Sequence, residues 1–226
     1  MLAPVHSTVK RINAMRRHVV KATKILAICC VGLIGPTQAA DLSDFHVLDC
    51  ENIFVADASA AMLSEEFGED NLESVEIYIG EGFTEIGTVL FGNSPEDRVE
   101  ILSKDVQEQK SPRRVQIHDN NSNWKTVNGI SLSVDLQMLE KMNRKPLRLS
   151  GFAWDYGGTV ISWSSGLLGR PRTNCRIGIS LLPNLPLRSV ALEKSYRQVL
   201  GETEYSSGHP AMQALNPKVY HIWLNY

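Results

Sequence analysis

Residues 147–163 read Leu-Arg-Leu-Ser-Gly-Phe-Ala-Trp-Asp-Tyr-Gly-Gly-Thr-Val-Ile-Ser-Trp. This stretch predicts a β-hairpin, because Gly157-Gly158 can adopt the positive φ angles that a two-residue type I′ turn requires. Side chains alternate between the two faces of a strand. One face of the hairpin therefore collects Phe152, Trp154, Tyr156, Thr159, Ile161 and Trp163. We expect this aromatic face to form the centre of a core.

A helix precedes the predicted hairpin. Apolar residues recur at helical spacing over residues 136–142. Either Ser133 or Asp135 can cap the start of this helix, and Pro146 stops it. The elements expected after the hairpin are a strand at 175–182, a short helix at 190–200, a loop at 202–217 and a closing strand at 219–226.

The chain before residue 119 shows the same order of elements. Ala60, Leu63 and Phe67 recur at helical spacing, Asp57 or Ser59 can cap this helix, and Gly68 suits the position after its end. The strands expected here are 53–55, 75–79, 86–91, 99–102 and 115–117.

These patterns predict an α+β fold with two tandem units, each a helix followed by an antiparallel sheet of about four strands. The first unit covers residues 40–119 and the second covers residues 120–226. The two units share short landmarks, such as Gly87-Thr88-Val89 and Gly158-Thr159-Val160, which favour an internal repeat.

The first 39 residues have the composition of a secretory signal peptide. They contain six Lys or Arg residues and no Asp or Glu, followed by an apolar run at 25–34 and small residues before the cut. We place the cleavage after Ala39, which predicts a periplasmic or secreted protein. The apolar run is short for a membrane span, so no stable transmembrane segment is expected after cleavage. Met1 and Met15 both remain candidates for the true start, and an uncleaved anchor is the alternative.

The charge of the chain is unevenly distributed. Residues 41–109 contain 18 acidic and two basic residues, whereas residues 110–226 contain seven acidic and 15 basic residues. Two solvated faces would account for this difference, but so would docking of the halves or attraction of a charged partner. The basic half has no clustered Lys and Arg stripe with interleaved aromatics, so we expect no nucleic-acid partner.

Two cysteines, Cys50 and Cys175, remain after the predicted cleavage. In an exported protein the simplest expectation is a disulfide between them. The alternative is a cysteine nucleophile, but neither residue lies in a recognisable catalytic motif.

The second unit carries a local pattern seen in known exported domains. Gly129-Ile130-Ser131-Leu132-Ser133-Val134-Asp135-Leu136 runs into Leu139, Asn143-Arg144-Lys145-Pro146 follows, and then Trp154-Asp155-Tyr156. This order resembles the beta-lactamase inhibitory protein architecture and the BamE (SmpA/OmlA) unit. Ser133-Val134 stands where such units have glycine-methionine, and Arg144 where they have glycine.

The mature chain also resembles an uncharacterised group of exported proteobacterial proteins. Residues 152–158 and the closing Pro210-Ala211-Met212-Gln213-Ala214-Leu215-Asn216-Pro217 carry this resemblance. It implies export and no defined activity. The resemblance to inhibitory proteins implies that a sheet face contacts a protein partner.

No catalytic constellation is evident in the sequence. The histidines that survive cleavage have no metal-ligand spacing, Ser164-Ser165-Gly166 lacks the nucleophile-elbow pattern, and no cofactor motif is found. We therefore predict no metal and no cofactor. A hydrolase site assembled from distant residues such as Asp155 and His118 remains the rival hypothesis.

The aromatic residues of the second unit are the remaining candidates. As core residues they need no further role; on an exposed face they would resemble binding hot spots. The leading hypothesis is a non-enzymatic binding module that contacts an envelope or secreted protein, and a structural envelope protein is a further alternative. The predicted binding residues are Trp154, Asp155, Tyr156, Trp163 and Arg148.

Overall fold

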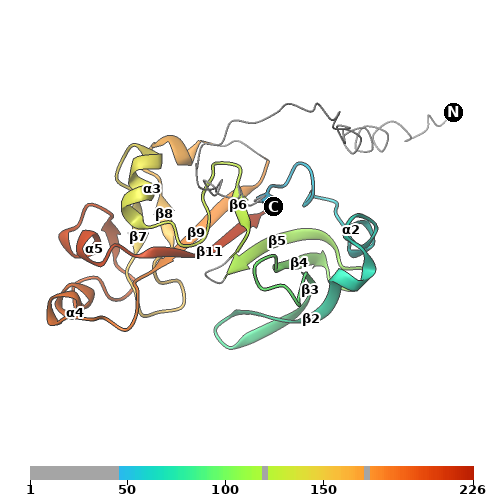
Figure 1. Cartoon of the computed structure of the whole chain (residues 1–226), viewed down its shortest axis with the longest axis horizontal. Coiled ribbons are helices and arrows are strands. Elements are labelled where there is room, and N and C mark those ends of the chain that lie inside the picture. Colours follow the sequence, from blue (N-terminus) through green and yellow to red (C-terminus); the bar gives the residue numbers. More distant parts are fainter. Residues whose placement is uncertain (1–45, 119–121, 171–173) are drawn as a thin grey trace, which may run out of the picture. The chain divides into compact units, whose positions relative to one another are not determined.

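Alternation of apolar and polar residues builds one large antiparallel sheet. The computed structural model describes residues 46–118, 122–170 and 174–226, so the predicted signal peptide at 1–39 lies outside the described residues. The six strands run in the order β2-β3-β4-β5-β11-β9 (Figure 1). Their bounds are β2 Leu72–Gly80, β3 Phe83–Leu90, β4 Val99–Asp105, β5 Lys110–His118, β11 Lys218–Asn225 and β9 Arg176–Leu182.

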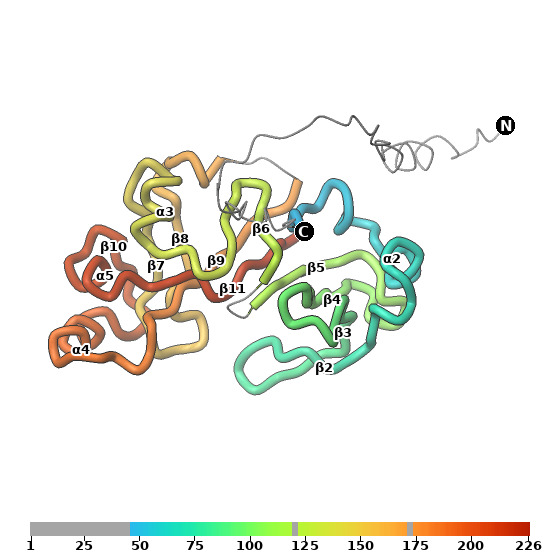
Figure 2. The backbone as a smooth tube through the Cα atoms, viewed as in Figure 1, coloured from blue at the N-terminus to red at the C-terminus, as the bar shows by residue number. Residues whose placement is uncertain are grey.

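Two smaller sheets accompany it. β1 (His46–Leu48) pairs in parallel with β6 (Trp124–Thr126). A three-stranded sheet has the order β10-β7-β8. Its strands are β10 Glu204–Ser206, β7 Arg148–Ser150 and β8 Val160–Ser162. The fold is therefore α+β, and the strands expected in the first and second units share the six-stranded sheet, since β11 lies between β5 and β9 (Figure 2).

The described part of the chain contains four short helices, and three of them begin at a Ser or Asp cap. The helices are α2 Ala60–Phe67, α3 Leu136–Asn143, α4 Val190–Arg197 and α5 Pro210–Leu215. Ser59 caps α2 by accepting a hydrogen bond from the Met62 amide at 3.2 Å, and Asp135 caps α3 in the same way. Two 3₁₀ turns, η1 Glu69–Asn71 and η2 Leu167–Gly169, complete the elements. No helix in the described ranges has both the length and the apolar composition to cross a membrane.

The predicted type I′ hairpin turn at Gly157-Gly158 is wrong, although the two glycines lie at the centre of a turn in which the Thr159 amide donates to the Tyr156 carbonyl at 3.3 Å. Type I′ requires a positive φ at both glycines, and only Gly158 has one. β7 and β8 are antiparallel neighbours, but Leu149 pairs with Val160, so a loop of residues 151–159 connects them. The physical reason is that Gly158 packs directly on β9. A Cβ atom there would lie 1.9 Å from the carbonyl oxygen of Leu181, and the Leu181 amide donates to Gly158 at 3.0 Å. Gly158 therefore combines a turn position of positive φ with close backbone approach to β9.

Two further expectations about local structure are wrong. Residues 53–55 lie in turns, with Phe54 fully buried among core residues, rather than in a strand. The expected loop at 202–217 contains β10 and α5. β10 and α5 are shorter than the windows in which periodicity can be recognised. β10 is held by pairing with β7, and α5 is capped by the ring of His209.

The main core lies on one face of the six-stranded sheet, and a small second cluster of Ile77, Val89 and Leu102 lies on the other face. Ile101, Val115, Ile117, Ile222 and Leu224 are at most 2% exposed and belong to one buried cluster. This cluster also contains buried residues of α2, α3, β6 and β7, namely Leu63, Leu136, Leu139, Trp124 and Leu149. Since side chains alternate, the residues between these strand positions must lie on the opposite face.

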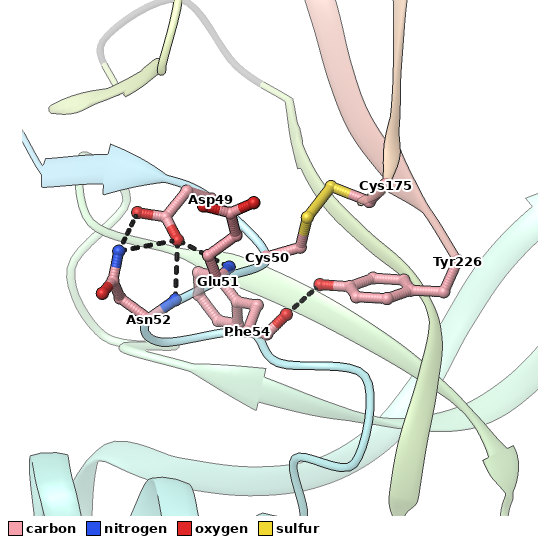
Figure 3. Close-up of a disulfide and its surroundings, with 7 residues drawn as sticks. All are labelled: Asp49, Cys50, Glu51, Asn52, Phe54, Cys175 and Tyr226. Carbon is pink, nitrogen blue, oxygen red and sulfur yellow. Dashed lines mark hydrogen bonds between the residues drawn. A yellow bond between two sulfur atoms is a disulfide. The ribbon is translucent and has the colours of Figure 1, made fainter. Parts of the chain in front are cut away.

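The predicted disulfide is confirmed. Cys50 is bonded to Cys175, with Cα atoms 6.2 Å apart and 125 residues of sequence separation (Figure 3). The Asp49 carboxylate accepts hydrogen bonds from the amides of Glu51 and Asn52, each at 2.9 Å. The Tyr226 hydroxyl donates to the carbonyl of Phe54. The bond therefore attaches the segment after β1 to the start of β9.

Candidate functional site

Strand register brings a row of side chains together on the sheet face opposite the core. Val89 pairs with Glu100, Glu100 with Gln116, Gln116 with Trp223, and Trp223 with Gly178. Residues paired across neighbouring strands lie on the same face. The row crosses five strands, and its members are separated by up to 134 positions in the sequence.

The indole of Trp223 lies over the backbone of β9. A Cβ atom at Gly178 would be 2.0 Å from the Cε2 atom of Trp223, so only glycine leaves room for the ring. The guanidinium carbon of Arg114 lies 5.7 Å from the centroid of the same ring. This is the geometry of a cation–π pair.

A buried carboxylate, Glu100, lies in the same row as Trp223, with Gln116 between them. Its oxygens accept hydrogen bonds from Gln116 at 2.9 Å and Arg98 at 3.2 Å, and the Nε2 atom of His118 is 3.0 Å away. Burial by itself raises the pKa of Glu100, but the hydrogen bonds from His118, Gln116 and Arg98 and the charge of His118 outweigh it and lower the pKa to about 2. Glu100 is therefore ionised throughout the physiological range.

His221 is next to this carboxylate group. Its ring lies 6.2 Å from that of His118 and 4.7 Å from that of Trp223. Burial lowers the pKa of His221 to about 3, and the charges of His118 and Arg114 contribute in the same direction. The Nε2 atom is buried and has no hydrogen-bond partner within the described part of the chain. His221 is therefore neutral near pH 7.

The loop of residues 151–159 adds two aromatic side chains to this region. Trp154 donates from Nε1 to the Gly151 carbonyl at 3.0 Å, and its ring meets that of Tyr156 edge to face at 5.3 Å. Burial and the charge of Arg113 lower the pKa of Arg114, and Tyr156 lies close enough for its phenolate, when ionised, to oppose that change. Tyr156 is 56% exposed. We call the combined surface the aromatic–histidine face; it comprises Glu100, Arg114, Gln116, His118, Trp154, Tyr156, His221 and Trp223.

The structure brings Trp154 and Tyr156 together but places other predicted binding residues elsewhere. Trp163 is partly buried and packs against the core after β8. Arg148 forms a surface ion pair with Glu204 at 2.7 Å on the three-stranded sheet. Asp155 is exposed in the loop between Trp154 and Tyr156.

Several residues of the face could not be identified from local sequence. Arg114, Gln116 and His118 alternate with the core residues of β5, and His221 and Trp223 alternate with those of β11. That alternation indicates which residues face away from the core. It does not show that β5 and β11, about 100 positions apart, pair with each other.

The geometry gives little support to acid–base chemistry on this face. A general base works best with a pKa near the working pH, whereas the pKa values of Glu100 and His221 are lowered to about 2 and about 3. The described residues surround a hollow of about 290 Å³ beside α2 and another of about 440 Å³ beside the disulfide, and neither is lined by a histidine. Within the described ranges, no three His, Cys, Asp or Glu residues are grouped as metal ligands.

Comparisons with protein-family models, curated proteins and solved structures find no match to this chain. The aromatic–histidine face is therefore the feature from which a function is proposed.

Proposed function

We propose that this protein is an exported, non-enzymatic binding module that contacts another envelope or secreted protein through the aromatic–histidine face. The observation that carries the proposal is that the Arg114–Trp223 pair and the Trp154–Tyr156 pair, drawn from three separate parts of the chain, lie near each other, with Tyr156 within electrostatic range of Arg114. Trp, Tyr and Arg are the residues that dominate the energetic centres of protein interfaces.

The exposure of Tyr156 supports binding more than folding. Tyr156 is 56% exposed, whereas Phe152 in the same loop is 1% exposed and belongs to the core. The core therefore uses Phe152 and does not need Tyr156. The fixed contacts around Trp223 and Glu100 would keep the face in one arrangement before binding, which reduces the entropy cost of association.

The proposed location is the periplasm or the exterior of the cell, after cleavage near Ala39. The disulfide between Cys50 and Cys175 is consistent with an oxidising compartment. The finer predictions of two duplicated units and of kinship with beta-lactamase inhibitory protein or BamE-like units remain part of this proposal.

Capture of the partner in intact cells tests the proposal. The mature protein carries a C-terminal tag, cells are treated with formaldehyde, and captured proteins are identified by mass spectrometry. We expect one dominant envelope or secreted partner, lost when Trp154→Ala and Tyr156→Ala are combined. The matched control combines Met138→Ala on α3 with Ile161→Ala on β8, because these side chains are 46% and 49% exposed but lie outside the face.

Both double variants must first show the melting temperature of the unchanged protein, which establishes that they are folded. Loss of capture in the first variant alone supports the proposal. Equal capture by both variants, or no specific partner, contradicts it and favours the structural-protein alternative. The hydrolase alternative would require activity that depends on His118 and Asp155.

A further inference from the structure

The β2–β3 hairpin lies at one side of the large sheet. Among the residues that the structure describes, β3 is the only strand that pairs with β2, so the outer edge of β2 is unpaired there. β3 pairs with β2 along its whole length, but pairs with β4 only from Thr88 to Leu90. The distal half of the hairpin therefore lies beyond the β4 ladder. An edge strand offers unpaired amide and carbonyl groups to another extended chain.

This hairpin also exposes large apolar side chains. Phe83 is 64% exposed, Tyr78 60%, Ile86 43% and Ile79 39%. Ile86 pairs with Glu76, and Thr84 pairs with Tyr78, so Glu76, Tyr78 and Ile86 share one face. A cluster of exposed apolar residues on an edge strand is a hazard for aggregation unless something guards or covers it.

Negative charge surrounds the same edge. From residue 56 to residue 97 the chain has 11 acidic residues and neither Lys nor Arg. Glu73 is 3.8 Å from Arg98, and Glu85 is paired with Arg113. In the part of the chain that the structure describes, Glu76 and Glu81 have no ion pair, and both are exposed.

We propose that the outer edge of β2 accepts a basic, extended segment of a partner protein as an added strand. Lys or Arg residues of that segment would lie on the face of Glu76, with Glu81 in the turn just beyond, and its alternate apolar residues would lie on the opposite face beside Val75 and Ile77. Backbone hydrogen bonds would supply affinity, and the alternating side chains would supply specificity. A second copy of the chain is a poor occupant, because its β2 would place carboxylates opposite carboxylates.

The register sets the extent of this surface. Pairing with β3 is regular from Leu72 to Tyr78, and shifts between Tyr78 and Gly80. α2 and η1 precede Leu72, so the regularly paired part of the added strand would run along Leu72–Tyr78, and Glu81 lies in the turn just beyond β2. This inference does not depend on the aromatic–histidine face.

A synthetic peptide of seven residues tests the inference directly. The probe is fluorescein-labelled Lys-Val-Lys-Val-Lys-Val-Lys, and its binding to the full mature protein is measured by fluorescence polarisation. We expect a dissociation constant below about 1 mM and no binding of the matching Glu-Val peptide. A third peptide keeps all charges but is N-methylated at alternate residues. It should bind about tenfold more weakly, because it lacks the backbone donors that pair with β2.

Charge reversal on the protein locates the site. Combining Glu76→Lys with Glu81→Lys should weaken binding of the Lys-Val peptide about tenfold, since attraction becomes repulsion at two positions. The matched control combines Glu65→Lys with Glu66→Lys on α2, which changes the net charge equally at exposed positions away from the edge. It should weaken binding less than about threefold, through long-range charge alone.

Three results would overturn the inference. The first is absence of Lys-Val peptide binding, which would mean that the acidic edge only prevents aggregation. The second is that the N-methylated peptide binds as tightly as the Lys-Val peptide, or that the α2 variant loses as much affinity as the β2 variant. Either result would mean that the peptide is attracted only by the overall negative charge. The third is self-association of the protein that is abolished by a proline in β2, which would identify a second copy as the occupant.

Discussion

The guanidinium group of Arg114 lies over the indole ring of Trp223, 5.7 Å from the ring centroid. These two residues are on neighbouring antiparallel strands, and the ring also covers Gly178 on the next strand. The pair therefore depends on the correct register of β5, β11 and β9 together. It forms the fixed part of the aromatic–histidine face, to which the loop adds Trp154 and Tyr156.

Substitution of Gly178 by Ala should displace the Trp223 ring, because the new Cβ atom would lie 2.0 Å from it. We expect a loss of about 1–3 kcal/mol in the free energy of unfolding from overpacking, together with an altered near-ultraviolet circular dichroism signal. Urea unfolding measures the first effect. Gly208→Ala is the control, since its Cβ atom would have an ordinary 3.6 Å contact with Ser206. Equal stability of both variants would contradict the close packing of Trp223.

Acid should destabilise the fold through His221. Its pKa is lowered from 6.5 to about 3 in the folded protein, so the unfolded chain binds a proton first as the pH falls below 6.5. Stability should therefore fall between pH 6.5 and pH 3, by roughly 2 kcal/mol between pH 6.5 and pH 5. His221→Phe should reduce this slope in urea unfolding measured from pH 7 to pH 4. Parallel curves for the variant and the unchanged protein would contradict the burial of a neutral His221.

Glu100 should matter more for stability than a surface carboxylate. Its side chain is 8% exposed and accepts hydrogen bonds from Gln116 and Arg98, whereas Glu204 is 44% exposed and pairs with Arg148. At pH 7 we expect Glu100→Gln to cost about 2–3 kcal/mol, and Glu204→Gln less than about 1 kcal/mol.

The same pair of variants has an expected pH dependence. The pKa of Glu100 is lowered from 4.5 to about 2, so its stabilisation is present above pH 4.5 and is lost as the pH falls toward 2. The difference between Glu100→Gln and the unchanged protein should therefore shrink in that window. A difference that stays constant down to pH 2 would contradict the ionised state of Glu100.

Removing the disulfide should lower stability without changing the arrangement of the sheet. The bond joins residues 125 positions apart, which in chain-entropy terms is worth about 4–5 kcal/mol at most. Urea unfolding with and without dithiothreitol measures this effect. The variant with both Cys50→Ala and Cys175→Ala is the control, and reductant should not alter its stability. A reductant effect of equal size in that control would assign the loss to another cause.

Local sequence was sufficient for the elements whose boundaries are set by nearby residues. For each of two helices the sequence offered two cap candidates, and the structure selects Ser59 over Asp57 and Asp135 over Ser133. A side-chain oxygen three positions before an amide is a local signal. The strands around Ile77, Ile101 and Ile222 were also predicted from alternation. The disulfide followed from having two cysteines in an exported chain.

The site could be predicted only in part, because half of it depends on long-range pairing. Trp154 and Tyr156 were predicted as binding residues because they lie in one aromatic segment whose side chains would resemble binding hot spots if they were exposed. Trp223 and Arg114 were not, since no local pattern shows that β11 inserts between β5 and β9. The type I′ turn at Gly157-Gly158 was predicted wrongly because glycine serves equally for a tight turn and for close approach to Leu181.

The most direct test of the proposed function is site-specific photocrosslinking in intact cells. A benzophenone amino acid replaces Tyr156 in the aromatic–histidine face or, as the control, Met138 on α3, which is also about half exposed. We predict one dominant crosslinked partner from position 156, lost when Arg114→Ala is added, and no such product from position 138. The same products from both positions, or none from position 156, would contradict the proposal that this face binds a protein.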